Sequence, residues 1–142
     1  MSLPDIARRS QLFAGLSEVE FQDVLSLSEP LRFAAGDVLW RQGDEGDGLY
    51  LVESGLVRIA TQPGPIQRDI VDLGPGQVFG EMALLSDEPR IADALIAEDA
   101  VLHRFGKAAF TELIESHDPA AHRLLLGLAR MLCVRLREVS AL

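Results

Sequence analysis

The chain has few cysteines, few basic residues and no long apolar run, and each shortage excludes a class of protein. Cys133 is its only cysteine, which excludes an internal disulfide and fits a reducing compartment. No apolar stretch reaches the roughly 18 residues that a membrane-spanning helix needs. The N-terminal MSLPDIARRS lacks the apolar core of a secretory signal. We therefore expect a cytoplasmic protein with no membrane partner.

Positive charge is also scarce. The 142 residues include 13 lysines and arginines against 22 acidic residues, which gives a formal net charge of −9. Such a chain is a poor match for nucleic acid, so we expect no nucleic-acid partner. Any anion-binding site would be a local exception and would need its own arginine or backbone donors. His103, His117 and His122 are scattered and form no ligand set with a single cysteine, which predicts no metal site.

The chain reads as one domain, residues 1–142, with helical ends and a β centre. The N-terminal part, 1–29, is helical, with Ser17 as N-cap and Glu20 placed as in a capping box. The centre, 30–106, consists of short apolar runs separated by turns, which is typical of an antiparallel sandwich or barrel. The C-terminal part, 107–142, is helical again. Its long second helix is capped by Asp118 and begins at Pro119.

The segment LYLVESGLVRIA shows the period-two alternation of a strand. On that pattern Leu49, Leu51, Val57 and Ile59 are expected to share one face. Glycines between the apolar runs are expected at turns, because glycine permits positive φ without a steric penalty. These glycines are Gly36, Gly43, Gly46, Gly48 and Gly55.

The last helix carries an apolar stripe at spacings of three and four residues. The stripe consists of Leu125, Leu128, Leu132, Leu136 and Val139. Two interpretations stay open: the stripe packs on its own domain, or it pairs with the same helix of a second copy in a homodimer. Cys133 lies within this apolar stretch and is expected to be a small buried side chain.

FGEMALLSDEPRIADA, residues 79–94, combines groups that suit a ligand with both hydroxyls and negative charge. Gly80 permits close approach to the backbone, Glu81 can accept bonds from sugar hydroxyls, and Arg90 offers a fork of donors to phosphate. Unpaired amides at the start of a helical turn would add donors, here from Gly80, Met82 and Ala83. The alternative is a surface ion pair of Glu81 with Arg90, worth about 0–1 kcal/mol, which would leave the glycine without a role.

The same stretch resembles the phosphate-binding cassette of the cyclic nucleotide-binding domain family, the sensor domain of catabolite activator protein-like regulators. GDVLWRQGDEGDGLYLVESGLVRI resembles the first strands of that family, and GPGQVFGE resembles its approach to the cassette. The resemblance covers about Leu12 to Leu136. It implies an α+β, mainly β fold: an antiparallel double-stranded β-helix (jelly roll, or β-roll) over 30–106, flanked by N-terminal helices and a long C-terminal helix.

The resemblance also implies a role for each residue of the site. Glu81 would hold the ribose 2′-hydroxyl and Arg90 the cyclic phosphate, while Val71 and Leu73 would pack near the base. The C-terminal helix would close over the base, with Arg130, Arg135 and Leu136 as candidate lid residues. The full expected set is Val71, Leu73, Phe79, Gly80, Glu81, Met82, Ala83, Arg90, Ile91, Ala92 and Arg135.

Two positions depart from the family pattern. Ile91 stands where a serine or threonine often follows the arginine, and the lost hydroxyl disfavours cGMP. Asp93 stands at a later hydroxyl position and would place negative charge near a negative ligand. Because strand residues alternate, and Ile91 and Ala92 are expected to begin the next strand, we expect Asp93 to face outward next to Arg68 or another surface cation.

These features predict a cyclic nucleotide sensor, with cAMP as ligand, in which the ligand repositions the C-terminal helix. No nucleophile with an adjacent base is evident, so we expect no enzyme activity. A degenerate interaction or dimerisation module is one alternative, motivated by Ile91 and Asp93. Another is the sensor part of a larger transcription regulator, whose helix-turn-helix would follow Leu142.

Overall fold

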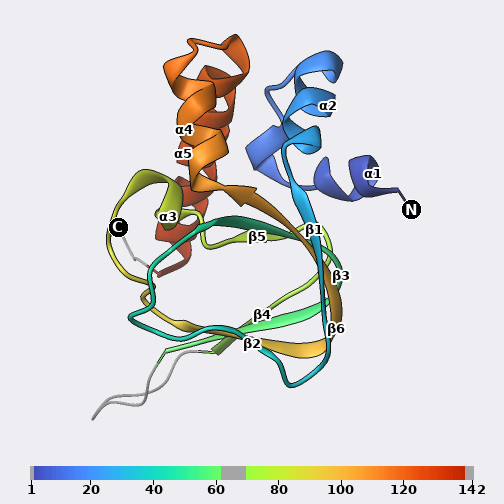
Figure 1. Ribbon diagram of the computed structural model, residues 1–142, viewed down its shortest axis with the longest axis vertical. Helices are drawn as coiled ribbons and strands as arrows, with labels where there is room; N and C mark the ends of the chain where they lie inside the picture. The colour runs from blue at the N-terminus through green and yellow to red at the C-terminus, as the bar shows by residue number, and fades with distance from the viewer. Residues whose placement is uncertain (1, 62–69, 140–142) are drawn as a thin grey trace.

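A β-roll with helices gathered at one end makes up the structure, a computed structural model that describes residues 2–61 and 70–139. Figure 1 shows α2, α4 and the first part of α5 lying together above the roll. The helical elements are α1 (Leu3–Ala7), the 3-10 helix η1 (Gln11–Phe13), α2 (Glu18–Ser26), α3 (Met82–Leu85), α4 (Lys107–Glu115) and α5 (Pro119–Val139). The strands are β1 (Glu29–Phe33), β2 (Val38–Trp40), β3 (Gly48–Ala60), β4 (Ile70–Leu73), β5 (Val78–Phe79) and β6 (Asp93–Gly106).

Helix boundaries follow local capping chemistry, as predicted. The Ser17 hydroxyl accepts the Glu20 amide at 3.2 Å, and the Glu20 carboxylate accepts the Ser17 amide at 2.9 Å, which completes the capping box of α2. At α5, the Asp118 carboxylate accepts the Ala120 amide at 2.8 Å, and proline occupies the first helical position. Both caps satisfy amides that would otherwise have no partner.

The strands form one antiparallel sheet in the order β1-β6-β3-β4, with β2 added on β6 and β5 on β3. The long strands β3 and β6 pair from Gly48 opposite Gly106 to Ala60 opposite Asp93, and they form the spine of the roll. The structure confirms the antiparallel, mainly β fold with a long C-terminal helix. Within the described residues, no helix has both the length and the hydropathy to cross a membrane.

A bulge in β3 overturns the expected common face of its apolar residues. The register with β6 shifts between Val52 and Ser54, where β3 has one extra residue, and twice more before Val57, where the extra residues are in β6. Leu49 and Leu51 therefore face the helical core, whereas Val57 and Ile59 belong to a second cluster inside the roll. The physical reason is that each extra unpaired residue reverses the side on which the following side chains point.

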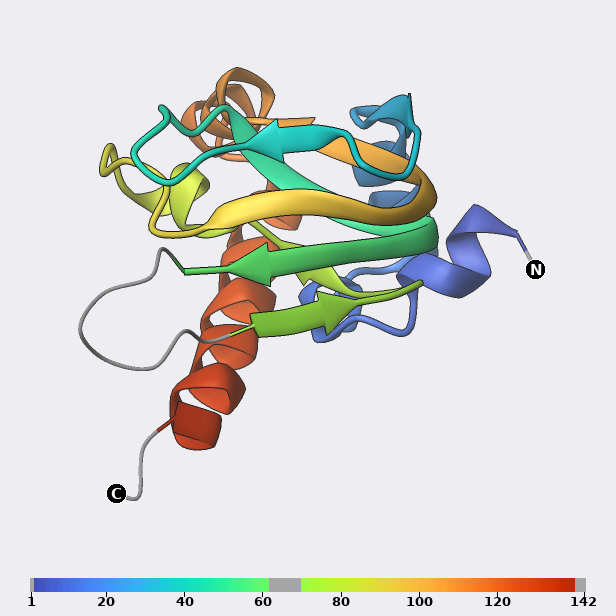
Figure 2. The ribbon, with the colours of Figure 1, turned by 90° about the horizontal axis from the view of Figure 1, so that it is seen from below.

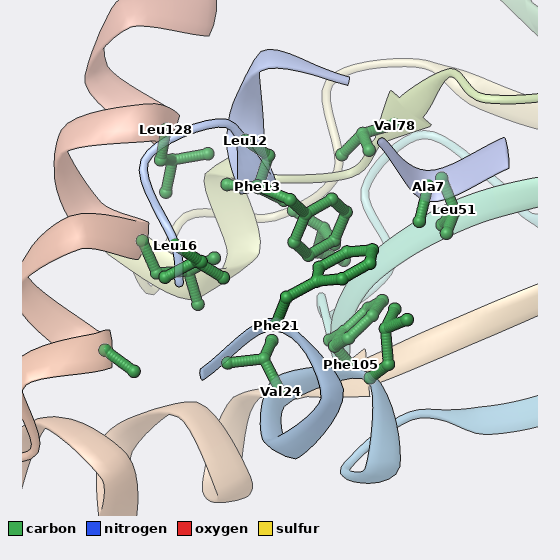
Figure 3. Packing of buried hydrophobic residues seen from close by; sticks show 14 of the residues in the cluster. Ala7, Leu12, Phe13, Leu16, Phe21, Val24, Leu51, Val78, Phe105 and Leu128 are labelled. Atoms are coloured by element: carbon green, nitrogen blue, oxygen red, sulfur yellow. The ribbon is translucent and has the colours of Figure 1, made fainter. Parts of the chain in front are cut away.

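The first of the two clusters fastens the helices to the roll. Figure 3 shows Phe13, Phe21 and Phe105 grouped in this core, with Leu128 of α5 nearby. The ring centroids of Phe13 lie 5.7 Å from Phe21 and 5.8 Å from Phe105, which are ordinary distances for aromatic packing. This core fixes the first half of α5 relative to the β-roll.

The apolar stripe of α5 is divided between buried and exposed residues. Leu128 is buried, Leu125 and Leu132 are partly buried, and Leu136 is exposed, while the Val139 side chain lies outside the described residues. Cys133 is exposed, so the prediction of a buried side chain was wrong. The helix buries Leu124, Leu128 and Met131, and a residue two positions after Met131 points away from that face.

Candidate functional site: a cavity behind the cassette

An open cavity of about 540 Å³ lies between the cassette, β4 and the second half of α5. Figure 2 shows α5 passing behind the end of β3 and the start of β4. The volume is in the range of pockets that hold small molecules, roughly 300–1,000 Å³. Every residue of the expected set lines this one cavity: Val71, Leu73, Phe79, Gly80, Glu81, Met82, Ala83, Arg90, Ile91, Ala92 and Arg135.

Gly80 shapes the cassette through its backbone. Its φ is +74°, a value that favours glycine. A Cβ at this position would lie 2.8 Å from Arg90 Nη1 and 2.9 Å from the Trp40 ring, so there is no room for a side chain. The Ala83 amide already donates to the Gly80 carbonyl at 3.3 Å. That donor is therefore used within the turn, and phosphate contacts from Gly80 and Met82 stay a prediction.

Arg90 is buried, with 7% of its surface exposed, and protein groups hold its guanidinium in place. It donates to the carbonyls of Gly80 at 3.0 Å and Gly48 at 2.9 Å, and to Asp47 Oδ1 at 3.1 Å. Its central carbon lies 3.6 Å from the centroid of Trp40. Burial lowers the pKa of Arg90, and the Asp47 charge partly offsets that effect. Its Nε is buried without a hydrogen-bond partner among the described residues.

Asp47 connects Arg90 to a wider network that the sequence reading missed. Its carboxylate accepts bonds from Arg104 at 2.9 Å and from the Tyr50 hydroxyl at 3.1 Å, besides that from Arg90. Burial would raise the pKa of Asp47, but the bonds from Arg104 and Tyr50 outweigh it and leave the pKa below its ordinary value. Burial, followed by the Asp47 charge, raises the pKa of Tyr50 to about 12.

The segment RQGDEGDG carries a signal for Asp47 in addition to its turn glycines. A buried arginine in an acidic chain requires a carboxylate nearby, and this segment offers three acidic residues. Gly46 in the same segment also has another role than the one predicted. Its φ is not positive; instead, a Cβ there would lie 2.6 Å from Ala83 Cβ, so its small size lets the two segments touch. Gly36, Gly43, Gly48 and Gly55 have the expected positive φ.

Glu81 is buried, with 5% of its surface exposed, and is bound by α5. Its carboxylate forms an ion pair with Arg135, whose guanidinium also donates to the Val78 carbonyl. The alternative of a surface ion pair between Glu81 and Arg90 is therefore wrong, because both side chains are buried and each has other partners. The cassette acid and the lid arginine are joined directly.

Asp93 faces inward, which corrects the expectation that it points outward. Only 6% of its surface is exposed, and its Oδ1 accepts the Gln42 amide at 2.7 Å. Its Oδ2 lies 3.5 Å from Nη1 of Arg41, an exposed cation, so the expected surface-cation neighbour is present, whereas Arg68 lies outside the described residues. The strand β6 begins at Asp93, so Ile91 and Ala92 precede it instead of starting it, and the assumed alternation was out of phase. Ile91 is 66% exposed at the cavity edge.

Of the three candidate lid residues, only one lies at the cavity, and its closing over a base stays a prediction. Arg135 lines the cavity, whereas Arg130 and Leu136 are exposed and do not line it. In their place the helix presents Met131, Val134 and Glu138. Positions 131, 134, 135 and 138 follow the three- and four-residue spacing of one helix face, which the sequence register did not identify. Among the described residues, no group of three or more His, Cys, Asp or Glu side chains is arranged to hold a metal ion.

Known proteins resemble this chain in sequence and in fold. The cyclic AMP receptor protein of Thermus thermophilus is 40% identical over 132 residues, 92% of this chain and 59% of that protein. A crystal structure of Thermus thermophilus catabolite activator protein superposes with a TM-score of 0.81 at 36% identity, and covers 92% of this chain and 60% of that one. The regulatory domain of Toxoplasma gondii PKA, solved with cAMP, gives 0.69 at 32% identity, over 78% of this chain and 42% of that one.

The chain thus spans about three fifths of the Thermus relative's length, 59%. The family described as "Cyclic nucleotide-binding domain" matches residues 30–117, which include the cassette and the strands that lead to it. The match covers more than half of the chain, so the chain belongs to the cyclic nucleotide-binding domain family.

Proposed function

We propose that the chain is a regulatory sensor domain whose ligand is cAMP. The observation that carries the proposal is the placement of two buried, oppositely charged side chains, Glu81 and Arg90, on one open cavity of about 540 Å³. A cyclic nucleotide needs an acceptor for its ribose hydroxyl and a cation for its phosphate, and this cavity offers both. No enzyme activity is part of the proposal.

Each part of the nucleotide has a proposed partner. Arg90 contacts the phosphate, because a guanidinium fork matches phosphate oxygens and the network around Asp47 holds the fork in place. Glu81 accepts the ribose 2′-hydroxyl. Apolar Val71 and Leu73 pack against the base on the β4 side. Ile91 offers no hydroxyl to a guanine, which supports cAMP over cGMP.

The same contacts supply a route for signalling. Arg135 lies on α5 and pairs with Glu81 in the cassette, so a ribose hydroxyl that binds Glu81 changes the contact that holds α5. We propose that this differential contact shifts α5 between two placements. What α5 controls is left out of the proposal, because this chain spans 59% of the Thermus relative's length. We also propose that the domain forms a homodimer through α5, on which Leu126 and Leu136 are exposed.

Isothermal titration with cAMP and with cGMP tests the proposal. We expect heat and a thermal shift with cAMP, and weaker binding of cGMP. Arg90→Leu should weaken cAMP binding by more than about tenfold, since it removes a charge-assisted bond to the phosphate. Arg58→Leu is the matched control, because Arg58 is an exposed arginine that pairs with Asp72 away from the cavity. Absence of heat and of thermal shift at millimolar cAMP would exclude the sensor function.

One observation favours a second candidate, an interaction module that binds no nucleotide. Glu81 and Arg90, the two groups that a nucleotide would engage, already have protein partners in Arg135 and Asp47. If these contacts are permanent, the cavity is a structural feature. No nucleotide binding, together with self-association that is the same with and without cAMP in sedimentation velocity, would support this candidate.

A further inference from the structure

Asp93 lies near the end of the cassette, three residues after the phosphate-site arginine. It is buried, and its carboxylate points at the loop that connects β2 to β3. Oδ1 accepts the Gln42 amide at 2.7 Å, and Oδ2 lies 3.5 Å from Arg41 Nη1. A short bond between a carboxylate and a backbone amide is charge-assisted and stronger than a neutral one. The negative charge of Asp93 is thus directed into the loop.

The same loop holds the backbone of Arg90 from both sides. The Gly43 amide donates to the Arg90 carbonyl at 2.8 Å, and the Arg90 amide donates to the Asp44 carbonyl at 2.8 Å. Just before the loop, the Trp40 indole donates to the Ala92 carbonyl at 2.9 Å, and its ring lies under the Arg90 guanidinium. Loop 41–44 and segment 90–93 are therefore joined along their length, and Asp93 makes the side-chain link at one end.

We propose that Asp93 is a positioning residue: by holding loop 41–44, it keeps the Arg90 guanidinium in place for phosphate. The inference rests on the proposed function of Arg90. It predicts that Asp93 strengthens the binding of an anionic ligand. Charge alone predicts the opposite, because a carboxylate near an anionic ligand costs affinity. A serine, the hydroxyl residue of the family pattern, has a shorter side chain and no charge, so it would not replace the 2.7 Å bond.

The test compares Asp93→Ala, Asp93→Ser and Asp93→Asn with the wild type in titrations with cAMP and with adenosine, which lacks the phosphate. The alanine and serine variants should bind cAMP about tenfold or more weakly, since a charge-assisted bond is lost. Asparagine keeps an acceptor oxygen for Gln42 and should recover most of the affinity. Adenosine binding should change little in all three, because only the phosphate contact depends on Arg90.

Asp99→Ala is the matched control. Asp99 lies on the same strand and its carboxylate also accepts a loop amide, that of Ala35 at 2.8 Å, but it is exposed and the residues next to Ala35 bond to Ile96, not to Arg90. This variant removes one negative charge and one comparable bond, and it should leave cAMP affinity unchanged. A purely stabilising role for Asp93 would lower the melting temperature of Asp93→Ala and weaken cAMP and adenosine binding equally, and would overturn the proposal.

Tighter cAMP binding by all three Asp93 variants, with an effect that fades at high salt, would show simple charge repulsion and also overturn it. If the wild type binds no cAMP, the proposed function fails, and Trp40 then tests the positioning alone. Trp40 is the only tryptophan, so its emission in the unliganded protein reports on the Arg90 site. A shifted emission in Asp93→Ala but not in Asp99→Ala would keep the positioning role; unchanged emission in both would reject it.

Discussion

The guanidinium of Arg135 forms an ion pair with the buried carboxylate of Glu81, which joins the last turns of α5 to the cassette. The first half of α5 is held by the hydrophobic core, through Leu124 and Leu128. The second half has fewer apolar anchors, since Leu136 is exposed. This pair is therefore a principal polar contact between the second half of α5, which we propose to move on ligand binding, and the ligand site.

Replacing Arg135 by alanine should loosen the end of α5 and leave Glu81 buried without its cation. The expected loss of unfolding free energy is about 1–3 kcal/mol, the cost of an unsatisfied buried polar group. Urea denaturation measures that loss, and hydrogen exchange should show faster amide exchange confined to the second half of α5. Arg137→Ala, an exposed arginine two residues further along α5, is the control and should change neither. Equal effects of the two variants would count against a role for the pair.

The only tyrosine of the chain, Tyr50, should titrate far above its ordinary range. Burial and the Asp47 carboxylate raise its pKa from 10.0 to about 12, because both disfavour the phenolate. Since the folded-state pKa is raised, its contribution to stability is fully present below pH 10.0 and is lost as the pH rises through about 12.

Ultraviolet absorbance of the phenolate measures this titration directly. At about pH 11 the folded protein should have about a tenth of Tyr50 ionised, against about nine tenths in urea. Asp47→Asn should lower the pKa only part of the way to 10.0, because burial, the larger cause, remains. Half-ionisation near 10.0 in protein that circular dichroism shows to be folded would disprove the buried Tyr50–Asp47 contact.

The features that the sequence predicted well are those determined by neighbouring residues. The caps at Ser17 and Asp118 depend on atoms a few positions apart, and the structure shows both. The cassette is likewise local: Gly80, Glu81 and Arg90 lie on one cavity, as expected. Composition and turn chemistry were enough for the antiparallel, mainly β class.

The features that the sequence predicted poorly depend on contacts between distant segments. Asp47 meets Arg90 across 43 positions, and Gln42 meets Asp93 across 51, so no local pattern could indicate either pair. The β3 bulge changed which side chains share a face, and period-two counting does not register it. The prediction of which α5 residues face the cavity was wrong for the same reason. Packing of the helix against η1 and the core decides which face meets the cavity, more than the apolar stripe of the helix does.

Gly127 shows how that packing is set, and it supplies the last prediction. It lies in the middle of α5, where η1 approaches so closely that an added Cβ would overlap the Leu12 carbonyl oxygen and lie 3.0 Å from that of Gln11. On helix propensity alone, Gly127→Ala should stabilise the protein by about 0.8–1.0 kcal/mol. Because the opposing atoms are backbone and cannot move aside, we expect the opposite sign, a loss of about 1–3 kcal/mol, as for other overpacked sites.

Gly15→Ala is the matched control for this steric effect. A Cβ at Gly15 would meet no atom within 4 Å, so this variant should be close to neutral. Thermal and urea unfolding of both variants give the comparison. Because α5 also supplies Arg135 to the cavity, a displaced helix should additionally weaken the Glu81 contact, and Gly127→Ala should speed amide exchange along the whole of α5. A stabilised Gly127→Ala protein would mean that η1 and α5 pack less closely than the structure shows, and that helix propensity outweighs the contact.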